Sequence, residues 1–383
     1  MREGWEYKRL GEVASFINGY AFKPEQWTSF GTPIVRIQNL NNPNAPFNYF
    51  SGEVPDKVKI KNGDLLISWS ASLGAYIWRG GYAYLNQHIF KVEFDKLNID
   101  KMYLKYAVIS NLNTMAGLVH GATMKHIVKK DFDNTCIPVP SLSTQESIVS
   151  ELDKINELIS LKKEQLKDYD NLAQSIFYDM FGDPVANDKG WEVKKLGEVY
   201  KVTSSKRILQ QDWQTKGIPF YKVADIVNLI NNELVVPAVY IKESTYEELK
   251  HKGLVPKGND ILITSRGTIG MCYIVKSSDK FYFQDGMITW LLQKEGCILP
   301  QYLKSLFEVK SFLDTMLDKV NISTVAYLSI KQMSNATIPL PPLPLQQAFA
   351  KRIEAIEQQK QLISSEIKDL ETLLASRMQY WFD

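Results

Sequence analysis

The sequence predicts an α+β fold in which two tandem β-rich domains are joined by two long helices that pair with each other as a coiled coil. Three observations predict this fold: the chain repeats itself, each copy begins with short strand-like runs, and each copy ends in a proline-rich segment followed by a helix with heptad spacing. The 383 residues are 45% hydrophobic and 23% charged. This composition is ordinary for globular proteins and excludes a disordered or collagen-like chain.

The chain consists of two copies of one unit, related as a pseudo-twofold internal repeat. The offset between matched residues is 186 near the start of each copy, 196 in the middle and 201 at the end. The matched segments are residues 4–13 with 190–199, 31–34 with 217–220, 64–68 with 260–264, 72–74 with 268–270, and 137–140 with 338–341. The second copy therefore gains ten residues between its early and middle segments.

The first part of each copy holds β-branched and aromatic residues in short runs separated by Gly, Asn and Asp. These runs predict the strands of a mostly β domain with a few helices. They are residues 64–69, 82–84, 89–94, 261–264 and 287–292.

After the proline-rich segment, apolar residues recur at alternating spacings of four and three. The seam positions are Ile148, Leu152, Ile155, Ile159 and Leu166 in the first copy and Ile353, Ile356, Ile363, Ile367 and Leu370 in the second. Such spacing predicts a coiled coil, because a period of 3.5 keeps one face against a partner helix. Two equal seams in one chain indicate that the helices pair with each other, over about 48 Å from residue 148 to residue 180. The alternative is an amphipathic helix that lies on a globular core.

Two lysines interrupt the seams at equivalent positions, Lys162 and Lys360. An apolar side chain would pack better at either position. We therefore hypothesise that the two lysines set the register of the helix pair.

Prolines and a turn-rich linker divide the chain. The prolines at positions 138, 140, 339, 341, 342 and 344 are expected to stop β structure before each helix and to fix the direction in which the helix begins. The predicted organisation is a first β-rich domain at 1–141, a central helix at 142–182, a linker at 183–189, a second β-rich domain at 190–342 and a C-terminal helix at 343–383.

The small net charge of +2 hides a segregation of charge along the chain. Each β-rich domain carries a net charge of +4, whereas the central helix with its linker carries −5 and the C-terminal helix −1. This distribution favours two separate contacts with a polyanion, joined by a spacer that avoids it.

Several kinds of chemistry have no motif in this sequence. There is no GxxxxGK[ST] phosphate loop, no [DN]PP[YF] tetrapeptide, no HExxH and no GxSxG. The three cysteines, Cys136, Cys272 and Cys297, are too far apart in sequence to suggest a disulfide framework or a zinc cluster. Residues 1–13 contain no apolar run, and no stretch approaches the length of a membrane span. We therefore expect a non-catalytic cytoplasmic protein with no membrane contact and no metal.

The ordered motifs of the two copies resemble the specificity subunit of type I restriction-modification systems over nearly the whole chain. The motifs are Trp5-Glu6-Tyr7-Lys8-Arg9-Leu10-Gly11-Glu12 and Trp191-Glu192-Val193-Lys194-Lys195-Leu196-Gly197-Glu198, Gly63-Asp64-Leu65-Leu66-Ile67 and Asn259-Asp260-Ile261-Leu262-Ile263, Gly267-Thr268-Ile269-Gly270, and Ile137-Pro138-Val139-Pro140 with Gln145 beside Ile338-Pro339-Leu340-Pro341 with Gln346. The first copy departs from the Gly-Thr-Ile-Gly pattern with Ala71-Ser72-Leu73-Gly74.

The resemblance implies two target recognition domains that each read one half of a bipartite site in double-stranded DNA. It further implies that the two long coiled-coil helices between these domains are antiparallel. It also implies two modification subunits, which use S-adenosylmethionine to methylate adenine, and restriction subunits, which translocate and cleave DNA with ATP and Mg²⁺. None of these cofactors is expected on this chain. Residues 36–39 and 222–225 differ between the copies, so we expect an asymmetric target.

Candidate DNA contacts are polar residues that follow strand-like runs. In the first copy they are Arg36, Gln38, Asn39, Ser68, Ser70, Ser72, Gln87, His88 and Lys125, and in the second Lys206, Arg207, Lys222, Asp225, Thr264, Arg266, Thr268, Gln284 and Asp285. Arg36, Gln38 and Asn39 suit a guanine fork and amide contacts to adenine, while the small hydroxyl residues suit a turn near phosphate. Lys125, Lys206 and Arg207 are phosphate candidates. For each residue the alternative is a solvated surface side chain.

Two other interpretations remain open at this point. One is a DNA-recognition subunit of a related system in which methylation and cleavage reside in one fused partner chain. The other is a coiled-coil scaffold whose β-rich domains bind protein, which predicts no salt-dependent affinity for DNA.

Overall fold

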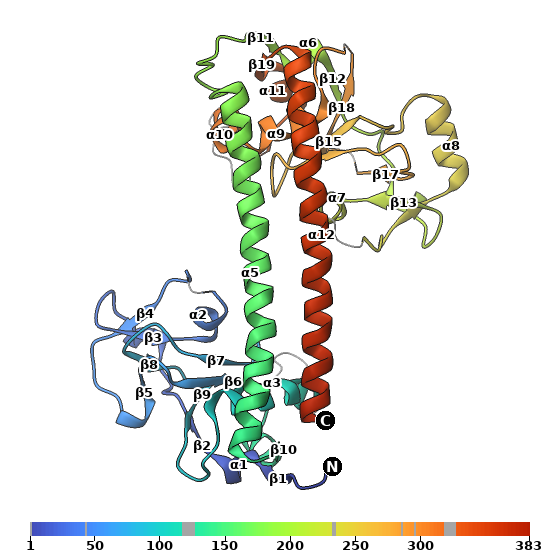
Figure 1. Ribbon diagram of the computed structural model, residues 1–383. Coiled ribbons are helices and arrows are strands. Elements are labelled where there is room, and N and C mark those ends of the chain that lie inside the picture. The colour runs from blue at the N-terminus through green and yellow to red at the C-terminus, as the bar shows by residue number, and fades with distance from the viewer. Residues whose placement is uncertain are drawn as a thin grey trace. The chain divides into compact units, whose positions relative to one another are not determined.

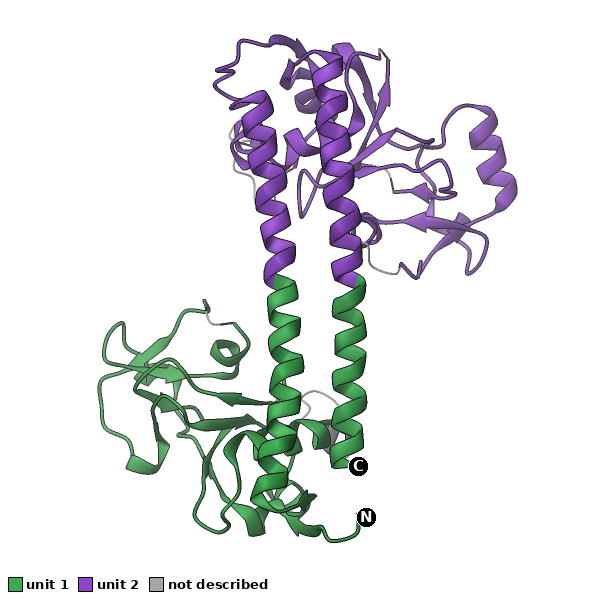
Figure 2. Ribbon diagram, viewed as in Figure 1, with its two compact units in different colours: residues 1–163, 365–383 green, residues 164–364 purple. Residues whose placement is uncertain are grey.

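The computed structural model describes residues 2–42, 44–116, 127–231, 235–284, 286–294, 296–317 and 327–383 (Figure 1). The chain divides into two compact units: unit 1 contains residues 1–163 and 365–383, and unit 2 contains residues 164–364 (Figure 2). Two 40-residue helices, α5 (Leu142–Phe181) and α12 (Leu343–Phe382), each contribute residues to both units. They begin at the two residues where the sequence predicts that each long helix starts.

The β-rich part of unit 1 combines short strands with a few helices. In order, its elements are β1 (Glu6–Arg9), α1 (Leu10–Val13), β2 (Ser15–Asn18), the 3-10 helix η1 (Pro24–Gln26), β3 (Thr32–Val35), α2 (Ile37–Asn41), β4 (Asn48–Phe50), the 3-10 helix η2 (Asp56–Val58), β5 (Lys59–Ile60), β6 (Leu65–Ser68), β7 (Gly74–Ile77), β8 (Ala83–Leu85), β9 (Ile89–Glu93), α3 (Lys101–Ala116), α4 (Lys129–Asn134) and β10 (Cys136–Val139).

Unit 2 repeats this order with two differences: one helix replaces η2 and β5, and two helices stand where unit 1 has α3. Its elements are β11 (Glu192–Lys195), α6 (Leu196–Val199), β12 (Tyr200–Thr203), the 3-10 helix η3 (Gln210–Asp212), β13 (Ile218–Tyr221), α7 (Val223–Ile230), β14 (Tyr240–Ile241), α8 (Glu243–His251), β15 (Ile261–Thr264), β16 (Cys272–Ile274), β17 (Tyr282–Phe283), β18 (Ile288–Gln293), α9 (Pro300–Glu308), α10 (Lys310–Leu317), α11 (Ile330–Asn335) and β19 (Thr337–Leu340).

The two units share the topology of their first and last sheets, whereas the second sheet has the order β4-β3-β8-β5 in unit 1 and β14-β13-β17 in unit 2. A four-stranded antiparallel sheet has the order β2-β9-β6-β7 in unit 1 and β12-β18-β15-β16 in unit 2. A second sheet contains a parallel pair, β3 with β8 and β13 with β17. A two-stranded antiparallel sheet joins the first and last strands of each unit before its long helix, β1 with β10 and β11 with β19. The α+β fold and the internal repeat are therefore confirmed.

Strands β6 and β15, which are inner strands of the antiparallel sheets, are buried on both faces. In β6, Leu65 and Ile67 belong to the core that includes the start of α5, whereas Leu66 faces a second core with Val35 and Leu85. Strand β15 repeats this alternation in unit 2. Burial on both faces explains why these strands are continuous apolar runs in the sequence.

The ten extra residues of unit 2 enter on either side of β14. The offset is 186 at β3 and β13, becomes 191 at the strands paired with them, β4 and β14, and reaches 196 at β6 and β15. Helix α8 accounts for the second step and stands where unit 1 has only the 3-10 helix η2 and the short β5. The added chain therefore replaces the short strand β5 of the second sheet, which in the described residues has four strands in unit 1 and three in unit 2, and leaves the sheet that contains β6 or β15 unchanged.

The proline-rich segments lie within strands. Pro138 pairs with β1 and Pro339 pairs with β11, so the prediction that these two prolines stop β structure is wrong. Both are tolerated because a two-stranded sheet has only edge strands, on which a missing N–H costs no ladder hydrogen bond. Each strand ends one residue before the next proline, Pro140 or Pro341.

A buried glutamine anchors the start of helix α5. Gln145 is 1% exposed; its Nε2 donates to the carbonyl oxygen of Pro140 at 2.8 Å and its Oε1 accepts from the backbone N–H of Asp100 at 2.8 Å. Nearby, the hydroxyl of Tyr103 donates to the carbonyl oxygen of Pro138 at 2.8 Å. These bonds hold the last strand, helix α3 and the beginning of α5 together.

Gln346 has the same position at the start of α12 and is fully buried. Its Nε2 donates to the carbonyl oxygens of Pro341 at 2.8 Å and Cys297 at 3.0 Å, and its Oε1 accepts from the backbone N–H of Leu299 at 2.8 Å. Each long helix thus leaves its β-rich domain in a direction set by one carboxamide.

The predicted seams are buried in both units. In unit 1, Ile148 and Leu152 share a core with Leu374 and Met378 of α12, and in unit 2, Ile353 and Ile356 share a core with residues 169–181 of α5. Ile155, Ile159, Ile363 and Ile367 are also buried, while Leu166 and Leu370 are half-buried. Both interpretations hold in part, because the helices pack on each other and, at their first seam residues, on the globular cores.

The two seam lysines make ion pairs between the helices. Lys162 Nζ lies 2.7 Å from Glu366 in unit 1, and Lys360 Nζ lies 2.7 Å from Asp170 and 3.2 Å from Glu357 in unit 2. Burial opposes the charge of Lys360, but its hydrogen bond to Asp170 and the charge of Glu357 raise its pKa. Polar pairs at equivalent seam positions support the register hypothesis.

Replacing Lys162 and Lys360 together by leucine is expected to raise the melting temperature and to remove the single register, because leucine packs well in several alignments of the helices. Calorimetry, light scattering and cysteine cross-linking between the helices measure these effects. The control is Lys163→Leu, which removes an exposed ion pair with Glu371 and should change neither quantity. A double variant with one oligomeric state and the original register would contradict the hypothesis.

Replacing Gln346 by leucine is expected to lower the free energy of unfolding by about 2–4 kcal/mol, because two carbonyl groups and one N–H lose their buried partner. Urea denaturation measures this loss. Gln361→Leu, at an exposed position of the same helix, is the matched control and should be nearly neutral. Equal stability of the two variants would show that the carboxamide does not anchor the helix.

Candidate nucleic-acid interface

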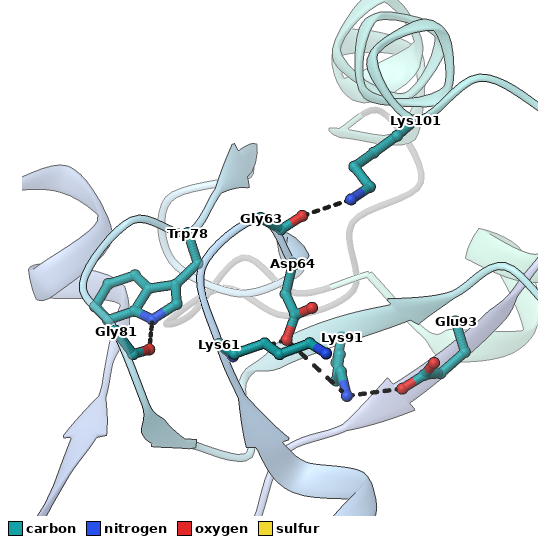
Figure 3. A network of polar contacts seen from close by, with 8 residues as sticks. All are labelled: Lys61, Gly63, Asp64, Trp78, Gly81, Lys91, Glu93 and Lys101. Atoms are coloured by element: carbon teal, nitrogen blue, oxygen red, sulfur yellow. Dashed lines mark hydrogen bonds and ion pairs between the residues drawn. The ribbon is translucent and has the colours of Figure 1, made fainter.

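Strand β6 is preceded by a tight turn that Asp64 holds (Figure 3). Its Oδ2 accepts a hydrogen bond from the backbone N–H of Lys61 at 2.9 Å, and Lys91 Nζ lies 4.0 Å from the same carboxylate and 2.8 Å from Glu93. Gly63 adopts a φ of 89°, which glycine reaches without strain. The turn fixes where β6 begins and therefore where the loop after it emerges.

The equivalent turn of unit 2 has a different support. Asp260 Oδ2 accepts from the backbone N–H of Lys257 at 2.9 Å and from Trp290 Nε1 at 3.0 Å. Burial raises the pKa of Asp260, and these two hydrogen bonds oppose the rise. Lys91 and Trp290 occupy equivalent places, since they pair with Leu66 and Leu262 in the two central strands.

The loops that follow β6 and β15 are closed by buried hydroxyl groups. Ser68 Oγ donates to the carbonyl oxygen of Ser72 at 2.5 Å. Thr264 Oγ1 donates to the carbonyl oxygen of Thr268 and accepts from the backbone N–H of Met271 at 3.1 Å. Each hydroxyl therefore determines the shape of its own loop.

Some of the predicted DNA contacts are wrong, because their side chains are buried. Ser68 and Thr264 are fully buried and Ser70 is 2% exposed, so these three side chains present no surface to DNA. Asn39 is 4% exposed; its Oδ1 accepts from the backbone N–H of Arg36 at 3.0 Å and its Nδ2 donates to the carbonyl oxygen of Ala45 at 3.1 Å. Its amide therefore holds the start of α2 and is not available for an adenine.

Parallel pairing explains how residues far apart in sequence meet. The carboxyl ends of parallel strands lie at the same edge of a sheet, and β3 and β8 are parallel. Arg36 follows β3, while Asn86, Gln87 and His88 follow β8, and the backbone N–H of Asn86 donates to the carbonyl oxygen of Val35 at 3.1 Å. In unit 2 Lys222 and Gln284 follow β13 and β17, and the N–H of Gln284 donates to the carbonyl of Tyr221 at 2.9 Å.

A cavity of about 420 Å³ lies at this edge of unit 1. The predicted contact residues that line it are Arg36, Gln38, Ser70, Gln87 and His88. The other residues that line it are Phe22, Pro24, Trp27, Ile37, Ala71, Asn86 and Ile89. The structure thus brings together candidates from three separate segments of the sequence. Polar side chains and backbone around one hollow can accept a flat polar ligand such as a base edge.

His88 lines this cavity beside Arg36 and Gln87. Burial and the nearby guanidinium of Arg36 lower the pKa of His88. Its Nε2 lies 3.3 Å from Nε2 of Gln87, and its Nδ1 has no hydrogen-bond partner among the residues that the structure describes. A neutral imidazole has one donor and one acceptor nitrogen.

A cation lies over a tryptophan at the same place in both units. Arg36 Cζ is 5.1 Å from the ring centre of Trp27, and Lys222 Nζ is 4.8 Å from that of Trp213. Arg36 Nη1 also donates to Asn48 Oδ1 at 3.1 Å. The predicted contact residues do not include Trp27, Trp213 or Asn48. The signal that identifies the two tryptophans is their separation of 186 residues, which is the same as that between Arg36 and Lys222.

The remaining predicted contact residues differ in their exposure to solvent. Lys206, Arg207, Arg266 and Thr268 are exposed, and Gln284 is half-buried. Asp225 Oδ2 accepts from the backbone N–H of Lys222 at 2.8 Å, as Asn39 does in unit 1. Ser72 in unit 1 is exposed. Lys125 and Asp285 lie outside the described residues.

Within the described ranges, none of the helices combines the length and hydrophobicity needed to cross a lipid bilayer. In the same part of the chain, no three His, Cys, Asp or Glu side chains are grouped in a way that suits a metal ion.

The duplicated unit, with polar side chains gathered at one sheet edge and a long helix after each copy, defines a two-part recognition protein. The chain matches the model of the type I restriction modification DNA specificity domain over residues 2–168 and 188–372, and it belongs to this family. It is a specificity subunit of a type I restriction-modification system, the component that carries two target recognition domains and no catalysis.

Known proteins are similar over nearly the whole chain. The EcoBI specificity subunit of Escherichia coli is 22% identical, with 93% of this chain and 80% of that protein covered. A putative type I restriction enzyme specificity subunit of Haemophilus influenzae is 28% identical, with 92% and 87% covered. The solved S subunit from M. genitalium has a TM-score of 0.52 at 16% identity, with 99% and 96% covered. A chain from a solved structure of the type I R-M system has a TM-score of 0.59 at 19% identity, with 99% of this chain and 97% of that chain covered.

Replacing Thr264 by valine is expected to lower the free energy of unfolding by about 1–3 kcal/mol, because the carbonyl of Thr268 and the N–H of Met271 lose a buried partner. Thr268→Val, at an exposed position of the same loop, is the control and should change stability little. Thermal unfolding monitored by circular dichroism measures both. Equal melting temperatures would show that the buried hydroxyl does not hold the loop.

Proposed function

We propose that this chain reads an asymmetric bipartite site in double-stranded DNA, with unit 1 on one half-site and unit 2 on the other. The observation that carries the proposal is the repeated sheet edge, at which the backbone is the same in both units and the side chains differ. Arg36 and Gln87 with His88 stand at the edge of unit 1, and Lys222 with Gln284 at that of unit 2. Equal frameworks with different reading side chains suit two different half-sites.

The long helices also support docking of partner subunits. Leu161 and Leu362 are 53% and 59% exposed, and Leu172 and Leu373 are 47% and 46% exposed. Both pairs are separated by 201 residues, so the same apolar side chains recur on α5 and α12. Repeated apolar positions on otherwise acidic helices suit two copies of one partner, as expected for two modification subunits.

The remaining parts of the proposal follow from this assembly. S-adenosylmethionine is used by the modification subunits, and ATP and Mg²⁺ by the restriction subunits, with none of these cofactors on this chain. The complex works on chromosomal DNA in the cytoplasm. The two units are linked through α5 and α12, each of which is about 60 Å long at 1.5 Å per residue, and this pair supplies the constant gap between half-sites.

The test is to co-express the chain with the adenine methyltransferase encoded beside it and to map every methylated adenine in the host DNA. We expect two short specified sequences separated by an unspecified gap of constant length. A single contiguous motif would show that only one unit reads bases, and methylation that does not depend on this chain would contradict the proposal.

A binding experiment separates the remaining alternatives. The purified complex is expected to bind its mapped site with an affinity that falls linearly with salt on a logarithmic scale, because phosphate contacts release counterions. Salt-independent binding, or none, would favour the protein-binding scaffold. Co-purification with a single chain that both methylates and cleaves would favour the related system with a fused partner.

A further inference from the structure

The cation and its tryptophan form a repeated structural element in both units. Arg36 and Lys222 follow the last residue of β3 and β13, and their backbone N–H groups are bonded to Asn39 at 3.0 Å and Asp225 at 2.8 Å. The side chains then lie over Trp27 and Trp213, at 5.1 Å and 4.8 Å from the ring centres. Strand, capping residue, cation and indole therefore all recur, although the two cations differ in chemistry.

The indole rings serve as platforms. Neither Trp27 Nε1 nor Trp213 Nε1 has a hydrogen-bond partner in the part of the chain that the structure describes, so packing and the cation hold each ring in place. Trp213 also packs against Phe220, with ring centres 5.8 Å apart. A cation over an indole face loses side-chain freedom before any ligand arrives, which lowers the entropy cost of binding.

The two platforms differ in the group opposite the cation. In unit 1, Asn48 Oδ1 accepts from Arg36 Nη1 at 3.1 Å. The equivalent strand position in unit 2 is Val239, which is buried and has no side-chain acceptor. A guanidinium has five N–H donors in one plane, and the bond to Asn48 uses one while orienting that plane. An ammonium has no plane to orient and needs no such partner.

We propose that Arg36, positioned by Trp27 and Asn48, is the specificity-determining side chain of unit 1 and reads a guanine through its O6 and N7 atoms. The proposal rests on the proposed function and adds the base that this residue selects. The guanidinium fork matches the two acceptors on the major-groove edge of guanine. Lys222 provides a point charge, which adds affinity and discriminates less between bases.

The cavity beside Arg36 agrees with this assignment. Gln38 and Gln87, which also line it, are exposed and can contact neighbouring bases. His88, which lines the same cavity, has its pKa lowered by burial and by the charge of Arg36. Arg36 is the residue with a permanent positive charge among those that line this cavity.

The test maps methylated adenines produced by the complex with variants of this chain. Arg36→Lys and Arg36→Ala are expected to lose the preference for guanine at one position of one half-site by roughly 5- to 150-fold. The other half-site should stay unchanged. Trp27→Phe should keep the preference because it retains a ring face, whereas Trp27→Leu should lose it at the same position as Arg36→Lys.

The controls separate this inference from the proposed function. Lys222→Ala should leave the guanine position intact and change only the other half-site or the overall extent of methylation. If wild type yields a bipartite motif and Arg36→Lys and Arg36→Ala, with unchanged melting temperatures, yield the same motif, the inference is overturned. If Trp27→Leu keeps the preference, the tryptophan does not position the arginine. A wild type without a bipartite motif would instead overturn the proposed function.

Discussion

The buried carboxamides of Gln145 and Gln346 hold together the elements on which the rest of each unit depends. Each side chain bonds to the end of the last strand and to the start of the helix α3 or α9, while its own backbone belongs to the first turn of a 40-residue helix. The strand closes the two-stranded sheet with β1 or β11, and that sheet joins the beginning of the unit to its end. One amide group thus links the closure of the β-rich domain to the direction of the helix that leaves it.

Much of this architecture is predictable from the sequence, because it depends on patterns within a few residues of one another. The repeat, the seams and the strands buried on both faces are visible as spacing and as apolar runs. The strand through Pro138 is not, because a proline is compatible with β structure only when the strand is an edge, and edge position is a property of the sheet. The parallel pairing of β3 with β8 also depends on a contact between residues about 50 positions apart.

The candidate interface was also predictable only in part from the sequence. Polar residues after strands were identifiable, and the parallel pairing brings Arg36, Gln87 and His88 to one edge. A hydroxyl that closes its own loop, such as Ser68, cannot be distinguished in sequence from one that faces solvent, because both follow an apolar strand. Trp27 is not among the predicted contacts, and its contact with the guanidinium of Arg36 gives it a place at the interface.

The two five-residue steps on either side of β14 separate each unit into parts with different freedom to change length. The sheet that contains β6 or β15, the closing strands and the long helix keep their topology, while strand β5 of the second sheet in unit 1 is replaced by helix α8 in unit 2. The chain from the end of β3 to the start of β6, and its counterpart in unit 2, therefore behaves as an exchangeable cassette within a constant frame. Insertions, deletions and recombination with break points in those two strands would vary the surface next to Arg36 or Lys222, while the core around the start of each long helix contains none of the described residues between these strands. A new target sequence could therefore arise while the core that anchors each long helix stays the same.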